Sequence, residues 1–194
     1  MEKTVKFCFR KIKSPAFFCF CFFLCMGISQ AAGTVPDGAH KTYDANGKVK
    51  AEMMYKGGKL NGPAKLYREG GKVSKEFSYT DNLLNGVAKE YDETGKLIKK
   101  FLYENGKLNG VSQEYYPGGQ LKAELNFKNN QLNGVSKRYF ENGKLKSETN
   151  FANNRPEGIY KQYDETGKAG AEVVFKDGVP VDTRNKVASG NKPI

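Results

Sequence analysis

The feature that most constrains this chain is a period of 24 residues that recurs six times without insertion. Throughout, a position is the place of a residue within its unit, counted from 1 to 24. Glycine occupies positions 2 and 11 of every unit, tyrosine occupies position 7, and position 19 is always aromatic. Such regularity predicts one small supersecondary structure repeated along the chain, each copy packing on its neighbours. The six units are 37–60, 61–84, 85–108, 109–132, 133–156 and 157–180.

Each unit has the pattern of two short strands. Positions 12–19 alternate between apolar and polar residues, as residues 144–151 show. Positions 21 and 22 carry residues that tolerate positive φ, such as Asn105-Gly106, which is typical of a two-residue type I′ hairpin turn. Positions 9–11 suit a three-residue hairpin loop that ends in a left-handed glycine. The sequence therefore predicts an all-β fold, with tandem 24-residue β-hairpin repeats forming one elongated, twisted antiparallel sheet.

The two turns also predict a register. The type I′ turn pairs position 19 with position 24, and the longer loop pairs position 13 with position 7. Strict alternation would then place positions 24 and 3 on opposite faces, so we predict a β-bulge that absorbs one extra residue at the glycine of position 2. With that bulge, positions 24, 3, 7, 13, 17 and 19 share one apolar face, which includes the tyrosine column. The bulge is predicted at Gly62, Gly86, Gly110 and Gly134.

The N-terminus has the pattern of an export signal. Residues 1–13 contain five basic side chains, residues 16–28 are apolar, and Ser29 and Ala31 fit the −3 and −1 positions of a cleavage site. We therefore expect a signal peptide over 1–31, followed by a short linker over 32–36. The apolar run is shorter than the roughly 20 residues of a membrane span, so an uncleaved membrane anchor is the lesser alternative. We expect an exported protein, periplasmic or secreted.

Export would leave a chain without thiols, because all four cysteines lie at or before Cys25. Residues 181–194 lack the repeat and are predicted to form a flexible tail. We find no residue pattern for a catalytic site, a cofactor or a metal. His40, the only histidine, has no cysteine near it in the sequence.

Charge supplies the candidate contact residues. The chain has a formal charge of +11, and removal of five basic residues and one acidic residue with the leader lowers it to +7. Lysines form two rows, at positions 5 and 12, which could meet an acidic protein partner, anionic lipid or an anionic envelope polymer. Nucleic acid is not an expected partner of an exported chain. The candidate contact residues are Lys65, Lys72, Lys89, Lys96, Lys137 and Lys144.

The acidic residues recur at position 16. We interpret them as partners in cross-strand Lys–Glu pairs, each worth roughly 0.2–1 kcal/mol, on the face that also carries the position-12 lysines. Lys100 interrupts this acidic row in the third unit. The tyrosines of position 7 could stack on ligands, but we favour packing between hairpins.

The repeat resembles a known family. Its recurring pattern, G-x-x-K-x-Y-x-x-x-G-K-[LV]-x-x-E-x-x-[YF]-x-N-G-x-L-N-G, is similar to the MORN repeat in its bacterial variant form. That form occurs in proteins named as antitoxins of the YwqK type, so the resemblance implies an antitoxin-like or immunity-like role as one alternative. From the residues themselves we expect a non-enzymatic interaction or scaffold protein of the bacterial envelope or exterior. The other alternative is a peripheral binder of anionic lipid or envelope polymer through its lysine rows.

Overall fold

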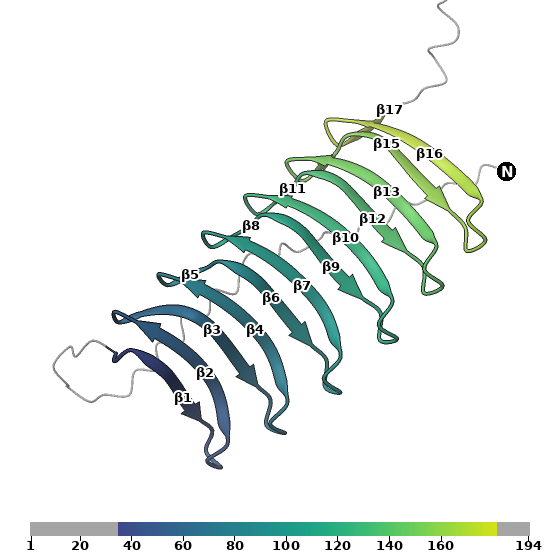
Figure 1. The fold of residues 1–194 in the computed structure, drawn as a ribbon. Coiled ribbons are helices and arrows are strands. Elements are labelled where there is room, and N and C mark those ends of the chain that lie inside the picture. Colours follow the sequence, from purple (N-terminus) through teal and green to yellow (C-terminus); the bar gives the residue numbers. More distant parts are fainter. Residues whose placement is uncertain (1–34, 182–194) are drawn as a thin grey trace, which may run out of the picture. The chain divides into compact units, whose positions relative to one another are not determined.

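A computed structural model describes residues 35–181, and these residues form only strands, turns and coil. Figure 1 shows the hairpins side by side in chain order, from purple at the first unit to yellow at the last. The expected all-β fold, with hairpin repeats of 24 residues in one antiparallel sheet, is confirmed. The strands are β1 (Gly38–Tyr43), β2 (Val49–Lys56), β3 (Lys59–Tyr67), β4 (Val73–Thr80), β5 (Leu83–Leu84), β6 (Gly86–Tyr91), β7 (Leu97–Glu104), β8 (Lys107–Leu108), β9 (Gly110–Tyr115), β10 (Leu121–Lys128), β11 (Gln131–Leu132), β12 (Gly134–Tyr139), β13 (Leu145–Ala152), β14 (Arg155–Pro156), β15 (Gly158–Tyr163), β16 (Ala169–Lys176) and β17 (Val179–Val181).

Each strand pairs with its neighbours along the chain. The long strand of one unit, for example β4, pairs with β3 of its own unit and with β5 and β6 of the following segment. The two-residue strands β5, β8, β11 and β14 are the first parts of the strands that follow them, separated by one residue. The sheet is therefore a meander in which each hairpin contacts only the hairpins before and after it.

The turn predictions are confirmed by the backbone angles. Both central residues of the type I′ turns have positive φ, as in Asn105 (49°) and Gly106 (78°). In the other loop, the position-11 glycine is left-handed, with φ of 94° at Gly95, and its amide donates to the carbonyl of Asp92. The Asp92 carboxylate also accepts the amides of Thr94 and Lys96 and the Thr94 hydroxyl, which holds the pKa of that carboxyl below its usual value.

The predicted bulge exists, but it absorbs two residues, not one. The position-2 glycines do have positive φ, 105° at Gly86 for example. On the side of the preceding strand, Leu84 pairs with Tyr79, whereas Lys89 pairs with Glu76, so five steps along one strand match three along the other. On the side of the following strand, pairing runs through the glycine without a break, and one residue is skipped at position 14 instead.

This larger bulge corrects the predicted apolar face. Position 4, and not position 3, shares a face with position 24. In the four inner units the side chains at position 4 are accordingly buried, with Ala88 and Ser112 only 2% exposed, while Val111 at position 3 is 45% exposed. The tyrosine column at position 7 also lies on the face opposite to the predicted one, because alternation from position 4 places it there.

The apolar face is packed along the sheet by side chains of neighbouring units. Leu108, Phe127 and Leu132, at positions 24 and 19, form the buried cluster, and partly buried side chains at positions 17 and 19 surround it. Because no second layer covers this face in the described residues, each unit buries its aromatic residue mainly against the units on either side.

A second link between units runs through the turns. The Asn130 amide donates to the carbonyl of Leu108, and the Asn130 side-chain oxygen accepts the Leu108 amide at 2.7 Å. The same pair of bonds joins Asn82 to Leu60 and Asn154 to Leu132. The asparagines of position 22 thus serve both the turn and the contact with the previous unit.

Candidate functional site

The face opposite the apolar one carries most of the regularly placed polar side chains. Cross-strand pairing places position 3 opposite position 18, and position 5 opposite position 16, as Val87 opposite Leu102 and Lys89 opposite Lys100 show. With the tyrosines of position 7, these residues define what we call the charged face. It is formed by every unit and therefore extends along the whole array of hairpins.

A single row of residues crosses this face from the first strand to the last long strand. Each member lies opposite the next one in the strand pairing, and lysine and glutamate alternate through most of the row. We call it the charge row. In order, it contains Lys41, Glu52, Lys65, Glu76, Lys89, Lys100, Gln113, Glu124, Lys137, Glu148, Lys161 and Glu172.

Several neighbours in the charge row form ion pairs. The Lys41 ammonium lies 2.6 Å from Glu52, while Glu76 is shared between Lys65 at 3.9 Å and Lys89 at 3.5 Å. The predicted Lys–Glu pairing is thus confirmed, but the lysines belong to position 5 and not to position 12. These side chains are partly exposed, so each pair contributes little to stability. The main consequence of the row is a regular arrangement of positive and negative charges on this face.

Three tyrosines of position 7 donate to glutamates of the charge row. Tyr67 donates to Glu52 at 2.7 Å, Tyr91 to Glu76 at 2.8 Å, and Tyr139 to Glu124 at 3.1 Å. Burial, with the Glu76 hydrogen bond as the second cause, raises the pKa of Tyr91 to about 12. The tyrosines therefore hold the carboxylates in place from the following unit, a role we had not predicted.

The charge row is interrupted once, between the third and fourth units. Lys100 stands where the other units have glutamate, so it lies opposite Lys89. Gln113, its neighbour on the other side, stands where other units have lysine, which avoids a third adjacent cation. Tyr115, whose glutamate acceptor is missing, donates to Gln113 instead. Within the described residues, Lys100 has no ion-pair partner.

Exposed apolar side chains adjoin the interruption. Val87, Leu102 and Val111 are 37%, 40% and 45% exposed. Leu102 follows Lys100 by two residues and shares its face, and Val87 lies directly opposite Leu102. The exposed column continues through Val135 and Ile159 in the later units. Two cations with apolar neighbours thus form a compact surface, which we call the Lys89–Lys100 patch (Val87, Lys89, Lys100, Leu102 and Val111).

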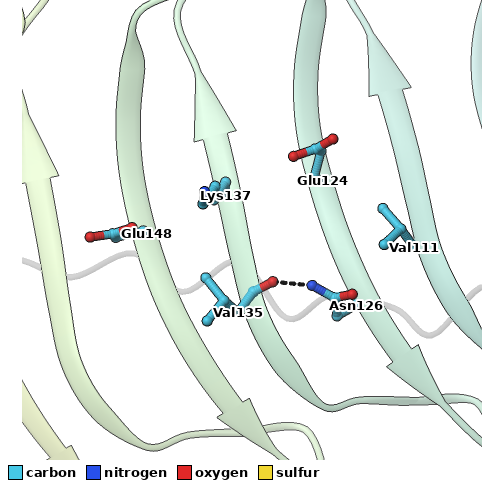
Figure 2. Close-up of a pocket in the computed structure, with 6 residues that line it drawn as sticks. All are labelled: Val111, Glu124, Asn126, Val135, Lys137 and Glu148. Atoms are coloured by element: carbon cyan, nitrogen blue, oxygen red, sulfur yellow. Dashed lines mark hydrogen bonds between the residues drawn. The ribbon is translucent and has the colours of Figure 1, made fainter.

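A shallow hollow lies one unit further along, with a volume of about 400 Å³ (Figure 2). Lys137 lies there between two carboxylates, Glu124 and Glu148, and the Asn126 amide donates to the carbonyl of Val135. Here the lysine is outnumbered by acidic groups. The Lys89–Lys100 patch is therefore the region of the charge row where positive charge is least compensated.

The position-12 lysines lie at the loop end of each hairpin and contact the next unit. Lys72 donates to the carbonyls of Glu93 and Thr94, both at 3.3 Å. Lys96 donates to the carbonyl of Pro117 at 3.1 Å, and Lys144 to that of Thr166 at 2.8 Å. Three of the six candidate contact lysines therefore link neighbouring loops, while Lys65, Lys89 and Lys137 belong to the charge row.

The described residues contain no group of three or more metal-ligating side chains. They also form no helix long and apolar enough to cross a membrane. The predicted signal peptide over 1–31, most of the linker over 32–36 and nearly all of the tail over 181–194 lie outside the described residues.

Comparison with known proteins identifies the repeat. A family model described as "MORN repeat variant" matches residues 36–56, 84–105, 108–129, 132–153 and 156–177, which together exceed half of the chain. No curated protein matches the chain.

Among solved structures, the chain is similar to a mutant of S. aureus TarM in complex with Fondaparinux, alpha-GlcNAc-glycerol and UDP. The two are 10% identical with a TM-score of 0.36, over 50% of this chain and 19% of that one. A second TarM structure is 12% identical with a TM-score of 0.36, over 54% of this chain and 21% of that one. The chain thus spans about a fifth of TarM, and similarity at this level says nothing about activity.

Proposed function

Because this chain belongs to the MORN repeat variant family, we propose that it is a non-enzymatic repeat protein that binds an acidic segment of a protein partner on its charged face. The observation that supports this most strongly is the interruption of the charge row at Lys100. Two lysines lie directly opposite each other, although like charges in that arrangement destabilise a sheet. A carboxylate from a partner would remove that repulsion.

The surroundings of the two lysines indicate what else the partner must offer. Exposed pairs between lysine and carboxylate contribute only about 0–1 kcal/mol each, so charge alone would give weak binding. Val87, Leu102 and Val111 add exposed apolar surface beside the lysines. We therefore infer a partner segment in which acidic residues alternate with apolar ones, so that both kinds of side chain contact the patch.

The export pattern of residues 1–31 supports placing this interaction in the envelope or outside the cell. Binding to anionic lipid through the lysine rows is less favoured, because many of these lysines are already engaged. The position-5 lysines face glutamates, and several position-12 lysines donate to loop carbonyls. An antitoxin-like role would be one instance of the proposed protein binding.

Titration of the full chain with a labelled peptide in which Glu alternates with Val tests the proposal. Lys100→Glu should weaken binding by about tenfold or more. Lys128→Glu makes the same change of charge at an exposed position outside the charge row and should bind like wild type. Equal affinities of the two variants, or binding of both only to anionic vesicles, would contradict the proposal.

The same substitution has an expected effect on stability of the opposite sign. Lys100→Glu replaces a pair of like charges with a lysine–glutamate pair and gives the third unit the glutamate that the other units have at position 16. The free energy of unfolding should rise by about 0.2–1 kcal/mol, measured by urea denaturation. A variant that lost both stability and binding would show that misfolding, and not the lost cation, explains the weaker binding.

A further inference from the structure

We propose that the sheet joins head to tail with a second copy of this chain, β1 of one copy pairing with β16 of the other. This goes beyond the proposed function and does not depend on it. β1 and β16 carry the two halves of a contact that recurs between inner units.

The contact is the bond between tyrosine and glutamate. Inside the array, three tyrosines of position 7 donate to the glutamate of the preceding unit, as Tyr67 does to Glu52. Tyr43 in the first unit has no preceding unit and is 59% exposed. Glu172 in the last unit has no following tyrosine. Within the described part of the chain, neither the Tyr43 hydroxyl nor the Glu172 carboxylate has a hydrogen-bond or ion-pair partner.

The small residues at position 15 also indicate that β16 lacks a neighbouring strand on one side. Ala51 and Ala123 are 5% and 1% exposed, because each is flanked by strands on both sides. Ala171, at the same position of the last unit, is exposed. A strand added along β16 would bury it as the inner alanines are buried.

β17, which pairs with one end of β16, resembles in sequence the segment of the second copy that would replace it. In β17, Val179 pairs with Lys176 and Pro180 with Phe175. The same dipeptide, Val35-Pro36, occupies the same positions, 23 and 24, ahead of the first unit. Val179 and Val181 are 63% and 43% exposed, so displacing β17 would cost little apolar contact.

The expected register follows from the inner units. Residues 35 and 36 of the second copy would take the places of Val179 and Pro180. Lys41 would then lie opposite Glu172, and Thr42 opposite Ala171, as Lys65 lies opposite Glu52 and Leu66 opposite Ala51. The charge row would continue across the junction with its alternation intact. Because the two surfaces differ, this contact is heterologous and each copy keeps a free edge for the next.

Disulfide formation between the two edges tests the register directly. Residues opposite each other in antiparallel strands have Cα atoms about 4.5–5.5 Å apart, within the range that a disulfide spans. In the full chain with its four cysteines replaced by serine, Thr42→Cys together with Ala171→Cys should give a ladder of linked oligomers on oxidation. Ala39→Cys with Ala171→Cys is the matched control, because position 3 lies on the other face of the sheet.

The proposal predicts linking of the Thr42/Ala171 variant well above the control. It also predicts that sedimentation velocity of the chain without added cysteines shows an average mass that rises with concentration, and that Glu172→Lys reduces this rise. Equal linking of the two variants would indicate chance collision and would overturn the proposed register. A mass that stays that of the monomer, with no linking, would overturn the association itself.

Discussion

At the scale of single residues, the two invariant glycines of the second unit share a positive φ but differ in their surroundings. Gly71, at position 11, has φ of 77° and open space where a Cβ would lie. Gly62, at position 2, has φ of 114°, and a Cβ there would lie 3.1 Å from the Cβ of Met54. Backbone conformation alone requires glycine at residue 71. At residue 62, the close approach of strands at the bulge requires it as well.

This difference predicts unequal costs of substitution within one unit. Gly71→Ala should lower the free energy of unfolding by about 1 kcal/mol, the usual cost of a left-handed alanine. Gly62→Ala should cost more, about 2–3 kcal/mol, because the strain is greater and Met54 must move. Urea denaturation of the two variants gives the comparison. Equal costs would show that the bulge does not crowd this glycine.

The tyrosines of position 7 make stability depend on pH in the alkaline range. The pKa of Tyr91 is about 12 in the folded protein, against an ordinary value of 10. A group whose pKa is raised on folding stabilises the fold fully below its unfolded pKa and loses that contribution as pH rises. The free energy of unfolding should therefore fall between pH 10 and 12, and less steeply in Tyr91→Phe than in wild type. Parallel curves for the two proteins would contradict this assignment.

At the scale of elements, the turn asparagines connect one unit to the next. Asn130→Gly keeps a residue that accepts positive φ but removes the oxygen that accepts the Leu108 amide. Loss of this acceptor should cost about 1 kcal/mol or slightly more, since the amide is partly buried. Asn129→Gly is the control, because Asn129 also has positive φ and precedes it in the turn. Thermal or urea unfolding should rank Asn130→Gly below Asn129→Gly, and the reverse order would argue against the side-chain bond.

The elements also show how far the sequence determines the fold. The turns follow from the sequence because positive φ is a local demand, and residues such as Asn105-Gly106 meet it. The size of the bulge does not, since it depends on how two neighbouring strands approach. A signal was present in the small side chains of position 4, such as Ala88 and Ser112, which close packing on the apolar face requires.

The candidate site was predictable only in part for a related reason. Lysine rows and a glutamate row are visible in the sequence, and so is their interruption at Lys100. Which lysine row faces the glutamates depends on the register between neighbouring strands. The predicted register differs from the observed one by one residue, because the bulge absorbs two residues and not one. Once the register is known, Lys100 and Gln113 are a matched pair of exceptions, because they lie opposite each other in the sheet.

At the scale of the whole molecule, one face of the sheet packs the units together and the other carries the charged and exposed side chains. One buries aromatic and small residues between units, with Leu108, Phe127 and Leu132 at its centre. The other carries the charge row, the tyrosines and the exposed valines. Both the proposed binding patch and the proposed junction between copies depend on this assignment of faces, which in turn depends on the two-residue bulge.

Reaction with a thiol reagent at two adjacent positions tests the assignment most directly, because the chain has no cysteine after Cys25. The four native cysteines are replaced by serine, and a single cysteine is placed at Val111 or at Ser112. Val111 is 45% exposed and Ser112 is 2% exposed. We predict rapid labelling of Val111→Cys and strong protection of Ser112→Cys in the folded protein, with equal rates in denaturant. Protection of residue 111 and rapid labelling of residue 112 would contradict the assignment of position 4 to the apolar face and position 3 to the charged face.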